Sequence, residues 1–520
     1  MLKGEKMSTS RRTFIKALAG SSAFAIGGCK SIFGFQKIKL AAVGLTNKGY
    51  TDWTPMLRSG LVEIVAFCDA DRSKYEMAMA RAKKDGFKED LAKVPFYTDY
   101  RKMFDDADFL GIEAMTVSTP DHAHGAIAIE AMKRGIHVFV QKPLVRTMWE
   151  LDYFEKTAKE NGVITQMGNQ ASSLDSLRRA TEVLRSGILG DVTEIHIWTN
   201  RPVWPQGKQV DNYIKSRKTG DVIPAGLDWN AWLGTAAERP FLDCYPKGMK
   251  IHDPWNMVKN VYHPGAWRGH FDFGCGALGD MACHMMNVPF RGLELYGATQ
   301  AEQIKADSTG GLAYPLNSVV KVVYPRRKSK VTPGKEFSAL DLYWYENEFR
   351  PDPERLYKWS STHGGKIPKT GCYIKGSKGD IIVLDDHGGK IAISLNGEKG
   401  FKDIFEHEAC KAVALEIPRC KILASAKAAD ENSMEMRGFA EEHYVEFLTA
   451  IRGEGPFYKD VNSRCFSDVE FSVPQMEGIL VGCMAQWVGG KVLWDSAKQK
   501  FDRADANNLL KPYIRKGWEF

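Results

Sequence analysis

The stretch IKLAAVGLTNKG, residues 38–49, carries the pattern on which the fold prediction rests. Residues 38–43 are mostly apolar and end at Gly44, as expected of a strand that is buried on both faces of a parallel sheet. Gly49 then opens a helical pattern that ends near Gly60. A strand, a glycine-containing turn and a helix in this order are typical of the first unit of a doubly wound α/β sheet.

The turn keeps two of the three glycines of the dinucleotide fingerprint G-x-G-x-x-G, at Gly44 and Gly49. Thr46 stands at the middle position, where its hydroxyl is able to donate to a phosphate oxygen at the helix N-terminus. Asn47 lies in the same turn and is counted with these residues as cofactor-binding.

Asp69 supports the same interpretation. It lies 20 residues beyond Gly49, directly after the apolar run 62–68. A carboxylate at this place binds the ribose 2′-hydroxyl and repels a 2′-phosphate, which favours NAD over NADP. The alternative is an N-terminal helix cap, for which Asp71 is the better candidate.

The alternation of strands and helices continues through residue 170. Further strands are predicted at 114–118, 137–140 and 164–167, with a helix at 123–134. With 520 residues the chain is too long for one core, so we expect a dinucleotide-binding domain at 37–170 and a second domain at 171–520. Strands of the second domain are predicted at 318–324, 339–345, 371–375, 380–384 and 390–394.

The bulk composition excludes several classes of protein. The formal charge of +7 is small for this length and its basic residues are scattered, which argues against a nucleic-acid partner. The 10 cysteines contain no C-x-x-C pair, so neither a zinc site nor a disulfide framework is indicated. No apolar run after the N-terminal segment is long enough to span a bilayer.

The first 29 residues resemble a twin-arginine export signal. SRRTFIK, residues 10–16, matches S-R-R-x-F-[LI]-K and precedes a short apolar stretch at 17–28. IGGC, residues 26–29, also looks like a lipobox that would make Cys29 a lipid anchor. We therefore expect a periplasmic or otherwise exported protein. Lipid attachment at Cys29 would make it a membrane-anchored lipoprotein.

Three stretches further along the chain carry a family resemblance. They are STPDHAHGAIAIEAMKRGIHVFVQKPL (118–144), LDWNAWLG (227–234) and GALGDMACHMMNVP (276–289). Together they resemble the glucose–fructose oxidoreductase / inositol dehydrogenase (Gfo/Idh/MocA) family. The resemblance implies an NAD(P)-dependent oxidoreductase with an N-terminal Rossmann domain. It also implies a C-terminal α/β domain whose open, mostly antiparallel sheet supports homo-oligomer contacts.

The resemblance also implies site residues. Lys142 matches the lysine of the family's E-K-P motif, and Asp280 and His284 match its D-x-x-x-H pair. The loop beside the nicotinamide contains Ser118, Thr119, Pro120 and His122. In two places the chain departs from the family: Gln141 replaces the usual Glu, and Asn287 stands where inositol-type enzymes often have Asp.

The chemistry of these residue types agrees with that implication. Asp280 and His284 are four residues apart, so on a helix they share one face. Oxidation of an alcohol needs an acceptor for the hydroxyl proton, and histidine is suited to this near neutral pH. A carboxylate can orient the ring, and Lys142 can hydrogen-bond the developing alkoxide. The alternative for His284 is a buried structural histidine.

The ligand at this site is predicted to be a carbohydrate. Aromatic residues are dense between 198 and 273, and sugar rings stack on aromatic faces. Tyr262, Arg268 and Asn287 are the candidates for substrate contact. A metal site built from His263, His270 and His284 lacks a convincing ligand set.

Export and nicotinamide chemistry together restrict the function. Outside the cytoplasm no soluble pool reoxidises NADH, so the cofactor must be tightly held and recycled in place. We therefore expect oxidation of a sugar or glycoside hydroxyl, for example at C3. One alternative is a redox-neutral NAD-dependent glycoside hydrolase or lyase. The other is a non-catalytic sugar-binding lipoprotein, against which the intact Lys142, Asp280 and His284 argue.

Overall fold

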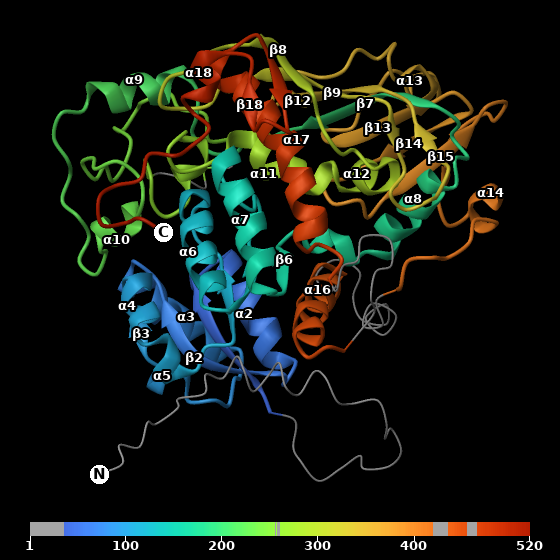
Figure 1. Ribbon diagram of the computed structural model, residues 1–520. Helices are drawn as coiled ribbons and strands as arrows, with labels where there is room; N and C mark the ends of the chain where they lie inside the picture. Colours follow the sequence, from blue (N-terminus) through green and yellow to red (C-terminus); the bar gives the residue numbers. More distant parts are fainter. Residues whose placement is uncertain (1–35, 255, 257–259, 420–434, 455–464) are drawn as a thin grey trace, which may run out of the picture. The chain divides into compact units, whose positions relative to one another are not determined.

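The computed structural model describes residues 36–254, 256, 260–419, 435–454 and 465–520. The predicted export signal and Cys29 lie outside these residues. Residues 38–520 form one compact unit (Figure 1). Among the helices of the described ranges, none is both long and apolar enough to cross a membrane.

The first layer of the described chain is a parallel sheet of six strands in the order β3-β2-β1-β4-β5-β6. The strands are β1 (Ile38–Val43), β2 (Val62–Cys68), β3 (Phe96–Tyr97), β4 (Ala114–Val117), β5 (His137–Val140) and β6 (Thr165–Met167). Its helices are α2 (Lys48–Arg58), α3 (Arg72–Lys84), α4 (Tyr100–Asp105), α5 (Ala107–Leu110), α6 (Asp121–Lys133) and α7 (Met148–Asn161). The predicted doubly wound parallel sheet is confirmed; β3, which has two half-buried residues, is not predicted.

β1 is apolar over most of its length because helices pack on both faces of this sheet. Leu40 and Ala42 pack into one cluster with α2 and α3, whereas Ala41 and Val43 pack into another with α4, α6 and α7. The chain order reverses between β1 and β4, so the turns after these two strands meet at the switch point of the sheet.

A second sheet contains ten of the described strands, in the order β16-β15-β14-β13-β7-β12-β9-β8-β17-β18. They are β7 (Val192–Thr199), β8 (Gln300–Ala306), β9 (Ser318–Tyr324), β12 (Leu340–Glu346), β13 (Gly371–Gly376), β14 (Gly379–Val383), β15 (Ile391–Leu395), β16 (Lys402–Asp403), β17 (Lys491–Asp495) and β18 (Lys500–Phe501). β7 pairs in parallel with β12 and the other pairings are antiparallel, which confirms the predicted sheet type. The central strand β7 is not among the predicted strands.

Helices join the two sheets through one continuous core. α17 (Val469–Val488) contacts α7 on one side and β8 and β9 on the other (Figure 1). α8 (Asp175–Arg185) packs on α12 (Asn287–Leu293), and α11 (Gly276–Met285) packs on α17. The domain boundary at residue 170 stays a prediction, although the first sheet ends close to it at Met167.

The remaining elements are short or peripheral. The helices are α9 (Lys208–Ser216), α10 (Trp229–Leu233), α13 (Tyr357–Thr362), α14 (Glu408–Lys411), α16 (Glu435–Ile451) and α18 (Ala504–Asn507), and β10 (Arg327–Lys328) pairs with β11 (Glu336–Phe337). Of these, α16 lies near the site. It packs against α2, the helix that begins directly after the turn that follows β1.

Candidate active site

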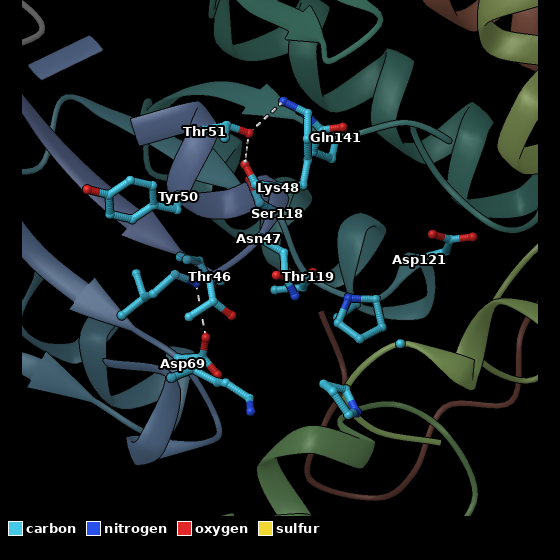
Figure 2. A pocket seen from close by; sticks show the side chains of 18 of the residues that line it. Thr46, Asn47, Lys48, Tyr50, Thr51, Asp69, Ser118, Thr119, Asp121 and Gln141 are labelled. Atoms are coloured by element: carbon cyan, nitrogen blue, oxygen red, sulfur yellow. Dashed lines mark hydrogen bonds between the residues drawn. The ribbon is translucent and has the colours of Figure 1, made fainter. Parts of the chain in front are cut away.

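A cavity of about 1300 Å³ lies at the carboxyl edge of the parallel sheet. The turns after β1, β2, β4 and β5 line it together with α11, a loop containing Trp267 and Arg268, and the turn between β14 and β15. Figure 2 shows labelled side chains from the four turns of the parallel sheet around the cavity, among them Thr46, Asp69, Thr119 and Gln141. This is the place where doubly wound folds bind their ligands.

The turn after β1 requires glycine at the first and last positions of the dinucleotide fingerprint. Gly44 has φ +80°, and a Cβ there would lie 2.3 Å from the carbonyl oxygen of Ser118. A Cβ on Gly49 would lie 2.0 Å from the carbonyl oxygen of Gly44. Thr46 and Asn47 line the cavity beside these glycines (Figure 2). The residues present therefore fit a dinucleotide, even though Thr46 replaces the middle glycine.

Asp69 lies at the end of β2 and lines the same cavity. Its two carboxylate oxygens accept hydrogen bonds from the backbone N–H groups of Leu45 (3.0 Å) and Asp71 (3.1 Å), which leaves lone pairs for a ribose hydroxyl. Burial raises the pKa of Asp69 to about 6. The helix cap is Asp71, which accepts from the N–H of Ser73, so the capping alternative applies to Asp71 and not to Asp69.

Lys142, Arg268 and Asp280 form an ion cluster that lines the same cavity. Lys142 Nζ donates to Asp280 Oδ1 at 2.6 Å and to the Asp280 carbonyl at 3.1 Å. Arg268 Nη1 donates to the same Oδ1 at 2.6 Å. Burial disfavours the charged form of Asp280, but Arg268 and Lys142 outweigh it and lower the pKa to about 2. Asp280 therefore stays ionised and holds both cations in place.

His284 lies one helical turn after Asp280 on α11 and is buried, yet it lines the cavity. Its Nδ1 has no hydrogen-bond partner within the described part of the chain. Burial, followed by the charge of Lys142, lowers the pKa of His284 well below its usual range. The imidazole is therefore neutral at pH 7.

The predicted hydrogen bond between Asp280 and His284 is not formed. The two residues share a face of α11 as expected, but Lys142 and Arg268 occupy the carboxylate. Two fixed cations are stronger partners for a buried carboxylate than a neutral ring. Asp280 therefore positions Lys142 rather than the histidine.

Three other predicted residues lie away from the cavity. His122 is buried, with Nε2 3.1 Å from the carbonyl of Trp232. Tyr262 stacks within an aromatic cluster around Trp229. Asn287 is buried and donates to Ser172 Oγ at 2.9 Å. Each of these side chains makes its contacts within the core. The spacing of residues along the sequence does not show the direction in which such side chains point. By contrast Thr119 and Pro120 line the cavity as expected.

A buried carboxylate that the sequence analysis does not identify explains Gln141. Asp52 on α2 is fully buried and accepts hydrogen bonds from Gln141 Nε2 at 2.9 and 3.1 Å. Ser118 Oγ donates to it at 2.7 Å, and Lys48 and Tyr444 of α16 also bond to it. A glutamate at position 141 would face a second carboxylate here, so the amide is the compatible residue.

Asp121, Arg201 and His387 are further cavity residues that the sequence analysis misses. Asp121 begins α6 and one of its oxygens accepts from the N–H of Cys275 at 3.1 Å. Its other oxygen has no partner among the residues described. Burial raises the pKa of Asp121 to about 7, and the nearby Asp280 adds to this while Arg268 opposes it.

Comparison with known proteins agrees with this geometry. Residues 38–169 match the sequence model of the family described as "Oxidoreductase family, NAD-binding Rossmann fold" (GFO_IDH_MocA). Residues 38–169 are therefore a domain of the Gfo/Idh/MocA type. The predicted family and its NAD cofactor are thereby confirmed, with the match lying in the first domain.

The chain spans less than half the length of the curated relatives that it matches. A 2,7-anhydro-N-acetylneuraminate hydratase of Mediterraneibacter gnavus is 28% identical over 107 residues, which is 21% of this chain and 28% of the relative. A levoglucosan dehydrogenase of Pseudarthrobacter phenanthrenivorans is 25% identical over 164 residues, 30% of this chain and 40% of the relative. A glycosyl hydrolase family 109 protein of Akkermansia muciniphila is 28% identical over 160 residues, 30% of this chain and 32% of the relative.

Solved structures share the fold over most of the chain. An inositol dehydrogenase homolog from Azotobacter vinelandii, complexed with NADH and myo-inositol, has a TM-score of 0.53 at 16% identity. The match covers 88% of this chain and 98% of that one. A levoglucosan dehydrogenase complexed with NADH and levoglucosan has a TM-score of 0.52 at 15% identity and covers 88% and 99%.

The raised pKa of Asp69 predicts a pH dependence of cofactor binding. Below about pH 6 the carboxyl group is protonated and becomes a weaker acceptor for the ribose hydroxyl. We expect the Kd for NAD to rise about three- to tenfold as the pH falls through this value. Calorimetry between about pH 5 and pH 8 measures this effect. Asp69→Asn should give a flatter profile, and an equally flat wild-type profile would exclude Asp69 from the ribose site.

Proposed function

We propose that this protein is an NAD-dependent oxidoreductase that oxidises a hydroxyl group of a sugar or glycoside. The observation that carries the proposal is that Lys142 and His284 line the same cavity as the Gly44 turn and Asp69. A carbohydrate is favoured because Trp204, Trp232 and Trp267 also line it, and because sugar-active proteins occur among the relatives.

Each residue of the ion cluster has a role in this proposal. Bound NAD would accept the hydride from the carbinol carbon. The neutral imidazole of His284 takes the hydroxyl proton. Lys142 donates a hydrogen bond to the oxygen as negative charge develops on it, and Asp280 holds the ammonium group in place. Arg268 packs over Trp267 with its guanidinium 4.5 Å from the ring centroid, and both residues line the cavity, which supports a contact of Arg268 with the substrate.

The proposal extends to cellular location and assembly. The twin-arginine pattern supports export to the periplasm, with Cys29 as the candidate lipid-attachment residue. An exported enzyme of this type keeps its NAD and recycles it in place. The protein acts on a small carbohydrate and functions as a homo-oligomer.

Redox-neutral cleavage of a glycoside is the second candidate function. Proteins named glycosyl hydrolase family 109 occur among the partial relatives. In such a cycle oxidation of the sugar is followed by bond cleavage and reduction, so the cofactor regains its original state without a second substrate.

The experiment starts from protein purified without added cofactor. We expect its absorption spectrum to contain the adenine and nicotinamide bands of a retained dinucleotide. The protein is then incubated with a panel of methyl glycosides, and mass spectrometry separates net oxidation to a keto-sugar from release of methanol. Protein that carries no dinucleotide and shows no affinity for NAD by calorimetry would overturn the proposal.

A further inference from the structure

A second imidazole faces the cavity beside His284. His387 lies in the turn between β14 and β15, far from His284 in the chain, and lines the same cavity. The two ring centroids are 4.7 Å apart and the planes meet at 83°. In the described chain neither Nδ1 atom has a hydrogen-bond partner. Two imidazoles from distant parts of the chain therefore border one substrate space.

The turn holds His387 in a defined place. Asp385 Oδ1 accepts the backbone N–H groups of His387 and Gly388, each at 2.7 Å. Ser176 of α8 donates its hydroxyl to the carbonyl of Gly388 at 2.6 Å. Asp386 bonds to Arg201 at 3.1 Å. Contacts from two neighbouring elements thus orient the turn toward the cavity.

Burial favours the neutral form of His387. Lys142, Arg201 and His284 face it from the other elements, and Asp385 and Asp386 belong to its own turn. Burial lowers the pKa of His387, and the two cations add to that effect while the two carboxylates oppose it. The imidazole is therefore unprotonated before a substrate binds, which is the form that accepts a proton.

Oxidation of one hydroxyl needs one proton acceptor, and His284 supplies it. We propose that His387 is a second catalytic base, which takes the proton from the carbon next to the newly formed carbonyl. This inference rests on the proposed function, because that carbon becomes acidic only after its neighbour is oxidised. The presence of a second base favours a substrate glycoside whose glycosidic bond is cleaved. It argues against a sugar that leaves the site as the ketone.

The step balances within the substrate and the histidine. The C–H bond breaks, its electron pair enters the enolate, and the proton moves to His387. The enolate then collapses, the bond from the anomeric carbon to the glycosidic oxygen breaks, and that oxygen leaves with the electron pair. It takes the proton back from His387, so the products are an unsaturated ketone and an alcohol. No oxidant or reductant is consumed in this step.

The test uses a substrate that is already oxidised, so it does not depend on hydride transfer. The full-length protein is incubated in D₂O with the methyl 3-keto-α- and β-glucosides, and NMR follows loss of the C2 hydrogen signal and release of methanol. We expect His387→Gln to slow both by about 100-fold or more. His363→Gln, which replaces an exposed histidine, should stay within about threefold of wild type.

Each outcome separates this inference from the proposed function. Unchanged rates in both His387→Gln and His387→Asn overturn it, as does an equal loss in His363→Gln. Reduction of retained NAD by a methyl glucoside is measured in parallel and should survive in His387→Gln. Wild-type protein that reduces NAD but neither exchanges the C2 hydrogen nor releases methanol would refute the second base and leave the oxidoreductase. Exchange without any NAD reduction would instead refute the oxidoreductase.

Discussion

Lys142→Ala is expected to reduce the turnover of a sugar substrate by about 10²- to 10⁴-fold, because it removes the donor to the developing alkoxide. The fold should survive, since Arg268 still pairs with the buried carboxylate of Asp280. The measurement is the rate of keto-sugar formation, or of glycoside cleavage, at saturating substrate, with the thermal midpoint recorded for each variant.

His284→Ala should lose turnover to a similar degree, because the hydroxyl proton then has no acceptor in place. Lys83→Ala, at an exposed position on α3, serves as the control and should keep wild-type activity. Turnover retained in both site variants would contradict the mechanism.

Gln141→Glu is expected to have the largest effect on stability. The substitution would place a second carboxylate against the fully buried Asp52. At present the amide of Gln141 donates a hydrogen bond to Asp52 at 2.9 Å. We expect the free energy of unfolding to fall by about 2–4 kcal/mol at neutral pH. The loss should shrink at lower pH, because the second carboxyl group is protonated more readily in the folded protein than in the unfolded chain.

The double variant Asp52→Asn with Gln141→Glu is the matched control. It returns one amide and one carboxylate to the pair, so we expect it to recover at least about 1 kcal/mol relative to Gln141→Glu alone. Denaturant unfolding at two pH values measures this coupling. A Gln141→Glu protein as stable as wild type would show that the contact with Asp52 is not maintained in solution.

Local patterns predicted the first domain well. The apolar runs, the glycines at 44 and 49 and the spacing to Asp69 depend on backbone shape and strand burial, which neighbouring residues largely determine. The short strand β3 and the central strand β7 are missing from the prediction. β3 has only two residues, and β7 lies beside strands far away in the chain.

Predictions that needed the direction of a side chain succeeded less often. Lys142, Asp280 and His284 meet at one cavity, as the family motifs imply. Asn287 and Tyr262 instead serve buried contacts, because polar atoms and aromatic rings in the core take whichever partner the packing offers.

The amino-acid sequence by itself determined the doubly wound domain and indicated its nicotinamide cofactor, since the strand, helix and glycine patterns are short-range. It indicated Lys142, Asp280 and His284 through the family resemblance. Only the tertiary structure decided that Asp280 pairs with Lys142 and Arg268, that Gln141 faces Asp52, and that His387 stands beside His284. The physical reason is that charge pairing and burial act between groups brought together by the fold, and their separation along the chain carries no information about such contacts.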